Sequence, residues 1–333
     1  GYPDLAEEII RSYGYEHITP TFLARAAVTH GGLNEAQKTQ EKCRRTLQHE
    51  GFMEACTYSF FSPRDFDLLR LPAEAPERRA IRILNPIGED LSVMRTILAP
   101  SMLSNVVRNV RRGNDAGRLF ELANVYLAGE LPLTELPEER SHISLALWGE
   151  GDFFDLKGAV EALAEAFDIR LTFVRGKKPF LHPGAAACVM LGEKEVGWLG
   201  EVHPAVAGEL ALEKKVYLGE LDYAALSKKF AKDITFHALP RYPDVVRDLA
   251  VVVAEEVACA QLQACILKAC KAARSAQFFD VFRGKALGEG KKSMAFHITF
   301  AADGDRALTP ELTEKYFGRI VEALHKELGA QLR

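Results

Sequence analysis

The sequence predicts an α+β fold, in which an antiparallel sheet with flanking helices is followed by a smaller β-α-β-β-α-β sandwich. Two observations support this prediction. The strand-like stretches of residues 25–236 show few regular alternations with helices, which favours an antiparallel sheet over a doubly wound parallel one. The last hundred residues place strand and helix patterns in the β-α-β-β-α-β order of a single sandwich.

The composition is typical of a globular protein with more than one domain. The chain has 333 residues, of which 48% are hydrophobic and 26% charged, enough to form two or three cores. Its apolar runs are shorter than the roughly 20 residues that cross a bilayer, and its acidic start is unlike a signal peptide. We therefore expect a cytoplasmic protein with no membrane role. The six cysteines form no CxxC pair, which favours reduced thiols over disulfides or zinc.

The net charge of −4 argues against a protein whose whole surface binds nucleic acid. The charge is unevenly distributed. Residues 239–333 hold 14 Lys and Arg against 12 Asp and Glu, a net charge of +2, whereas residues 1–238 hold 28 against 34, a net charge of −6. Any phosphate-binding role is therefore expected in the C-terminal part.

The first residues predict a short acidic helix. Pro3 stands at its start, and Asp4, Glu7 and Glu8 follow at the spacing i, i+3 and i+4. This spacing places three carboxylates on one helical face, a hard-oxygen set that suits Mg²⁺. The alternative is that acidic residues simply favour the positive end of the helix dipole. Such a short helix is marginal alone in water, so we expect an upstream domain to pack against it.

Residues 25–236 carry the patterns of the larger sheet. One helix is expected from Asn34, whose side chain can cap it, to the residue before Gly51. Another is expected from Pro100 to Gly113, with apolar residues at i, i+3, i+4 and i+7. The remaining expected elements are strands at 56–60, 118–127 and 143–148, a helix at 153–167, and short strands near Leu171, Val189, Trp198 and Val216.

The last hundred residues predict a ferredoxin-like sandwich. Strands are expected at 248–253, 277–283 and 294–300, a helix at 260–272, a long helix from Thr309 to Gly329 and a closing strand at 330–333. Strict alternation along the second strand predicts one face with Phe278, Asp280 and Phe282, and the opposite face with Phe279, Val281 and Arg283.

One segment carries more information than any other. The run NPIGEDLSVMRT at residues 85–96 precedes the amphipathic helix, and GRLFEL follows at 117–122. Both resemble the synthetase-like domain of the non-catalytic β subunit of bacterial phenylalanyl-tRNA synthetase, a class II synthetase-like fold. Further segments resemble the same family in the same order: DLAEE at 4–8, DFFDLKG at 152–158, LHPG at 181–184, RYP at 241–243, RDLA at 247–250, FDVFRG at 279–284, EGKKS at 289–293 and DRALT at 305–309.

The resemblance implies a division into domains and a set of roles. Residues 1–24 correspond to the end of a small upstream domain plus a linker, 25–236 to the non-catalytic synthetase-like domain, and 239–333 to the ferredoxin-fold anticodon-binding domain. The family assembles as an (αβ)₂ heterotetramer with a catalytic α subunit, which uses ATP to attach phenylalanine to tRNA-Phe. It also places Mg²⁺ on the segment of Asp4, Glu7 and Glu8, with a further aspartate expected upstream of this sequence.

The resemblance also implies that the larger domain is inactive by itself. Active class II enzymes hold ATP phosphates with a strand arginine and with a second arginine near the end of the domain. Glu121 stands where the first is expected, although Arg118 is near, and the segment 219–223 contains no arginine. We therefore expect phenylalanine activation to belong to the α subunit, and no hydrolysis of mischarged tRNA by this chain. The helices at 34–48 and 102–110 are the expected contacts with the α subunit.

In the C-terminal domain, a sheet face without helices can stack aromatic side chains on unpaired bases and present cations to phosphates. The residues expected to contact tRNA are Arg241, Arg247, Phe282, Arg283, Lys285, Lys291 and Lys292. Two other functions stay open from the sequence: an amino-acid-binding regulatory module, and an independent ATP-dependent ligase.

Overall fold

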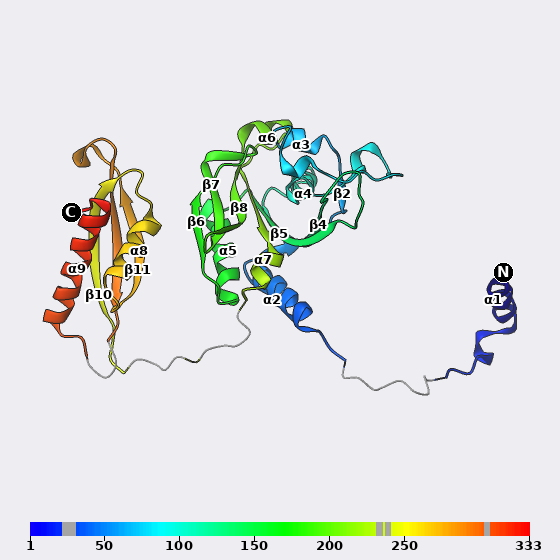
Figure 1. The fold of residues 1–333 in the computed structure, drawn as a ribbon, viewed down its shortest axis with the longest axis horizontal. Helices are drawn as coiled ribbons and strands as arrows, with labels where there is room; N and C mark the ends of the chain where they lie inside the picture. The colour runs from blue at the N-terminus through cyan, green and yellow to red at the C-terminus, as the bar shows by residue number, and fades with distance from the viewer. Residues whose placement is uncertain (22–30, 231–235, 237–240, 303–306) are drawn as a thin grey trace. The chain divides into compact units, whose positions relative to one another are not determined.

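The computed structural model describes residues 1–21, 31–230, 236, 241–302 and 307–333 (Figure 1). These residues form two compact units, Gly1–Asp233 and Ile234–Arg333. The domain boundaries expected after residue 24 and before residue 239 lie outside the described residues, as do Asp305 and Arg306. Within the described ranges no helix has the length and apolar character needed to span a membrane.

A seven-stranded sheet forms the centre of the first unit, in the order β1-β4-β5-β9-β8-β7-β6. All neighbouring strands pair antiparallel except β1 and β4, which pair parallel, so the sheet is mixed where the sequence predicted an antiparallel one. The strands are β1 (Met53–Glu54), β4 (Gly117–Leu127), β5 (Glu138–Trp148), β6 (Leu171–Arg175), β7 (Leu181–Leu191), β8 (Lys194–Val202) and β9 (Val216–Asp222).

Helices cover both faces of this sheet. One face packs against α2 (Glu35–His49), α5 (Phe153–Ala166) and α7 (Tyr223–Ser227). The other face packs against α3 (Asp65–Leu68), α4 (Ala99–Arg111) and α6 (Pro204–Glu209). The expected cap of α2 forms, because Asn34 accepts from the backbone of Gln37. Asp152, which was not predicted as a cap, accepts from the backbone of Phe154 and Asp155 and begins α5. The predicted apolar stripe of α4 is buried at Leu103, Val106 and Val107.

The strand predicted at residues 56–60 is wrong. Only Phe60–Phe61 form a strand, β2, which pairs with β3 (Val93–Met94) in a separate two-stranded sheet. The preceding backbone has other partners, because Ala55 N–H donates to the carbonyl of Phe120 and Thr57 N–H to the carboxylate of Glu121. The Glu121 side chain thus accepts the hydrogen bond that the Thr57 N–H would donate to a neighbouring strand in a sheet.

The second unit has the predicted β-α-β-β-α-β order. Its sheet runs β11-β12-β10-β13, and both helices pack on the face that carries Met294, Phe296 and Ile298. Thr309 caps the last helix and Gly329 ends it in the left-handed conformation (φ 63°), as predicted. The elements are β10 (Val245–Ala254), α8 (Cys259–Ala269), β11 (Ala273–Phe282), β12 (Lys291–Phe300), α9 (Pro310–Leu328) and β13 (Gln331–Leu332).

The predicted alternation along β11 is wrong because the pairing with β12 shifts between Phe278 and Asp280. Phe278 lies opposite the core residue Phe296, with ring centroids 5.9 Å apart in an edge-on arrangement. After the shift, Phe282 lies opposite Ser293, which is on the face without helices. A β-bulge of this kind inserts one unpaired residue and reverses which face the following side chains share. Phe278 and Phe282 therefore lie on opposite faces.

Candidate functional site

Three buried polar side chains cross the centre of the main sheet in one row. Glu121 on β4 pairs with Ser144 on β5, and Ser144 pairs with Glu220 on β9. Each is at most 3% exposed. Their strand neighbours on the same side belong to the core beneath α4, so the row faces α4. Two buried carboxylates need nearby donors or cations to offset the loss of water.

Arg95 supplies the cation for Glu121. Its Nη1 lies 3.2 Å from Glu121 Oε1, and both side chains are 4% exposed. The Thr57 hydroxyl lies 2.9 Å and 2.8 Å from the two carboxylate oxygens and accepts from Arg95 Nη1 at 2.9 Å. Arg95 Nε donates to the carbonyl of Asn124 at 2.7 Å. The Arg95 guanidinium is therefore held inside the fold, where it neutralises the charge of Glu121.

Glu220 binds the start of α4. Its Oε2 accepts from Leu98 N–H at 2.9 Å, and its Oε1 lies 2.7 Å from Nδ1 of His142. Between the two carboxylates, the Ser144 hydroxyl is fully buried and has no hydrogen-bond partner among the described residues. Arg95 and Leu98 thus bind the two ends of the row, which holds the segment leading into α4 against the sheet.

These contacts decide what the row can do chemically. Glu121 and Glu220 stand in the two regions where the resemblance implies arginines in active enzymes, and a carboxylate repels a phosphate. Arg118, the cation noted beside Glu121 in the sequence, points to the opposite face, where it lies over the Phe52 ring and 3.9 Å from Asp155. Arg95 was not predicted as the partner of Glu121, although it lies within the motif at 85–96.

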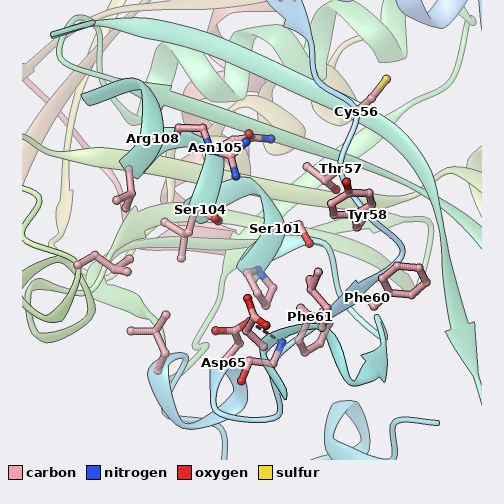
Figure 2. A pocket seen from close by; sticks show the side chains of 18 of the residues that line it. Cys56, Thr57, Tyr58, Phe60, Phe61, Asp65, Ser101, Ser104, Asn105 and Arg108 are labelled. Atoms are coloured by element: carbon pink, nitrogen blue, oxygen red, sulfur yellow. Dashed lines mark hydrogen bonds between the residues drawn. The ribbon is translucent and has the colours of Figure 1, made fainter. Parts of the chain in front are cut away.

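A groove of about 860 Å³ runs along the outer side of α4. Figure 2 shows Arg108 toward one end and Asp65 toward the other, with Ser101 between them and Tyr58 and Phe60 on the facing segment. Arg111 and Asp90 also line it, as does the exposed thiol of Cys56. Burial raises the pKa of Asp65, which the Ser62 N–H opposes and the charge of Asp90 reinforces. The groove therefore has a basic end, an acidic end and an aromatic wall.

The helix-less face of the second unit carries aromatic side chains in two places. Phe279 stacks on His297 with centroids 4.0 Å apart, and His297 Nδ1 lies 2.6 Å from Asp248. Phe282 lies beneath the Arg333 guanidinium at 5.1 Å. Phe279 and Phe282 are 47% and 42% exposed, so their rings are accessible to a ligand. Of these side chains, only Phe282 was predicted from the sequence to contact tRNA, and Phe279 was predicted to lie on the opposite face.

The structure separates the cations predicted to contact tRNA. Arg247 lies near the start of β10 on the side of the helices, 4.0 Å from Glu314 of α9. Lys291 pairs with the last residue of β10, roughly 23 Å away by strand geometry. Lys291, Lys285 and Arg241 are exposed, and Arg283 bonds Glu255. Lys292 is 8% exposed and donates to the Glu255 carbonyl at 2.7 Å, so most of its side chain lies inside the fold.

The acidic helix α1 (Tyr2–Tyr13) carries Asp4, Glu7 and Glu8 as predicted, all exposed. Glu8 contacts Arg11, so one of the three carboxylates already has a cationic partner. Among the described residues no three His, Cys, Asp or Glu side chains form a group able to hold a metal ion. The Mg²⁺ ligand set of Asp4, Glu7 and Glu8 therefore stays a prediction.

Comparisons with known proteins match both units. Residues 19–223 match the model of the phenylalanyl tRNA synthetase beta chain CLM domain, and residues 240–333 match that of the ferredoxin-fold anticodon binding domain. Two similar proteins are the phenylalanine–tRNA ligase beta subunits of Clostridium acetobutylicum, at 34% identity, and of Symbiobacterium thermophilum, at 37% identity. Each alignment covers 99% of this chain. The chain spans 42% and 38% of their lengths.

Among solved structures, a pyrrolysyl tRNA synthetase from Desulfitobacterium hafniense aligns with 58% of this chain and 66% of its own. Its TM-score is 0.47 at 17% identity, a likeness too weak to support an argument. The two family matches, which lie on separate units in the order that the sequence motifs predict, carry the assignment. This chain belongs to the phenylalanyl-tRNA synthetase β chain family.

Proposed function

We propose that this chain is the part of a phenylalanine–tRNA ligase β subunit that holds the catalytic α subunit and contacts the anticodon region of tRNA-Phe. The buried carboxylate row supports the proposal, because Glu121 and Glu220 stand in the two regions where active class II enzymes are expected to carry ATP-binding arginines. In this proposal ATP and Mg²⁺ are used by the α subunit within an (αβ)₂ heterotetramer in the cytoplasm. The synthetase-like unit then serves as a scaffold.

We place the α subunit in the groove along α4. Arg108 and Arg111 at its basic end form no ion pair with any residue in the described ranges, and the exposed ring of Tyr58 and the half-buried ring of Phe60 line its wall. A partner segment that brings an acidic side chain to this end and a basic one to Asp65 and Asp90 would be complementary in charge. This agrees with the sequence prediction that the helix at 102–110 is a contact. The other predicted contact, the helix at 34–48, has an exposed polar face and is the secondary candidate.

The double substitution Arg108→Glu and Arg111→Glu is expected to weaken the complex with the α subunit at least tenfold, since like charges then face the partner's acidic group. Surface plasmon resonance with immobilised α subunit measures the affinity. Arg112→Glu is the control for one reversed charge on the same helix end, because Arg112 is exposed but outside the groove. Equal losses in the double variant and the control would place the contact elsewhere. Cys56 gives a second readout, since the bound α subunit should protect its thiol from maleimide.

The RNA role is tested by filter binding of tRNA-Phe at two salt concentrations, with and without the α subunit. We expect binding that weakens with salt, and a salt dependence that falls by roughly one unit for each phosphate-contacting cation removed, as in Lys285→Gln or Lys291→Gln. Absence of tRNA binding in both conditions would refute the RNA role. Amino-acid binding without tRNA binding would instead favour a regulatory module. Phenylalanine-dependent pyrophosphate exchange by this chain alone would indicate an independent ligase.

A further inference from the structure

The Arg283 guanidinium forms a two-point ion pair with the carboxylate of Glu255 in the same chain. Arg283 Nε lies 3.0 Å and 3.2 Å from the two oxygens of Glu255, and Nη2 lies 2.8 Å from Oε1. Glu255 directly follows β10, and Arg283 directly follows β11. This is the planar, two-point geometry with which arginine also binds a phosphate. The Nε edge of Arg283 is therefore occupied by an anion that resembles the proposed ligand.

Two further contacts fix Glu255 in this place. Lys292 Nζ lies 4.0 Å from Glu255 Oε1 and donates to its backbone carbonyl at 2.7 Å. The hydrogen bond from Arg283 holds the pKa of Glu255 below its usual value, and the charges of Arg283 and Lys292 act in the same direction. Glu255 is thus a fixed negative charge at neutral pH, at the end of the sheet where Lys285 and Lys291 are exposed.

We propose that Glu255 is an internal competitor of RNA: its carboxylate occupies Arg283 and lowers the affinity of this end of the sheet for phosphate. The inference rests on the proposed RNA role and adds the residue that limits it. The side chains of Arg283 and Glu255 are 57% and 47% exposed, so their bond is of the weak, solvent-screened kind that a phosphate can displace. Once displaced, the Glu255 carboxylate stays near Arg283, because its backbone is held by Lys292, and it repels the bound phosphate.

The variants Glu255→Gln and Glu256→Gln separate this role from a general charge effect. Both residues are exposed neighbours, and each variant removes one negative charge, but only Glu255 bonds Arg283. The intact chain is applied to a heparin column, which presents a polyanion independently of any tRNA role. Glu255→Gln is expected to elute at clearly higher salt than Glu256→Gln, and the difference should vanish when Arg283→Gln is added to both. Equal elution of the two single variants would overturn the proposal.

Titration with tRNA-Phe provides the second arm. Glu255→Gln is expected to bind about threefold more tightly than Glu256→Gln, with a salt dependence steeper by roughly 0.7–0.9 because one more cation contacts phosphate. Weaker tRNA binding by Glu255→Gln than by Glu256→Gln would show that Glu255 orients Arg283 and would likewise overturn competition. If the unsubstituted chain does not bind tRNA, the proposed function fails, while the heparin comparison still decides the role of Glu255.

Discussion

Replacing Glu121 with glutamine is expected to lower the free energy of unfolding of the first unit by about 3–5 kcal/mol. The substitution keeps the size of the side chain but leaves the Arg95 guanidinium buried without a counter-charge, and both side chains are only 4% exposed. A lone buried charge is costly because the interior cannot replace the water that it has lost. Urea unfolding measures the change through tryptophan fluorescence, since the chain's two tryptophans, Trp148 and Trp198, both lie in this unit.

Two comparisons make this result specific. The double variant Arg95→Met with Glu121→Leu removes both charges, so it should be considerably more stable than Glu121→Gln. Glu139→Gln is the surface control, because Glu139 is exposed on the neighbouring strand β5 and should change stability by less than about 0.5 kcal/mol. If Glu121→Gln is no less stable than this control, the row is not the structural element that we describe.

Replacing Phe279 with alanine is expected to weaken tRNA-Phe binding by about 1–3 kcal/mol, or roughly 5–150-fold, which is the usual contribution of one base stacked on an aromatic ring. Phe279 lies on the face without helices, and His297 supports its ring from behind. Fluorescence anisotropy with labelled tRNA at constant salt measures the loss. Because stacking involves no phosphate, the salt dependence should stay the same, unlike that of the lysine variants.

The control for this variant is Phe154→Ala. Phe154 is 71% exposed but belongs to the first unit, so its removal should leave tRNA affinity unchanged. Circular dichroism checks that Phe279→Ala keeps its fold, since Phe279 packs on His297 and not within the core. Unchanged affinity in a folded Phe279→Ala chain would remove this ring from the proposed RNA surface.

Elements that depend on neighbouring residues could be predicted from the sequence. The starts of α2, α5 and α9 follow from Asn34, Asp152 and Thr309, whose side chains accept from the backbone two or three residues further on. The stop of α9 at Gly329 requires only that residue's tolerance of positive φ. Such signals lie within one helical turn, so they can be identified before the fold is known.

The candidate sites were only partly predictable. Lys292 looked like a surface cation beside Lys291, but strand alternation directs it inward, to the carbonyl of Glu255, 37 residues earlier in the chain. Phe278 and Phe282 were predicted to share a face, but the bulge in β11 places them on opposite faces. Alternation along a strand predicts the face of each side chain correctly only while the pairing with the neighbouring strand is regular. The sequence of one strand does not show where a β-bulge shifts that pairing.

The sequence by itself determined the β-α-β-β-α-β order of the second unit and most helix boundaries. It also determined that a negative charge, Glu121, stands where active class II enzymes have an arginine. Only the tertiary structure decided which cation neutralises that carboxylate, which face each aromatic ring occupies and which lysine is inside. The physical reason is distance along the chain. Arg95 and Glu121 are 26 residues apart in the sequence, and Leu98 and Glu220 are 122 residues apart. These contacts therefore depend on how the strands and α4 pack, and local sequence propensities do not determine them.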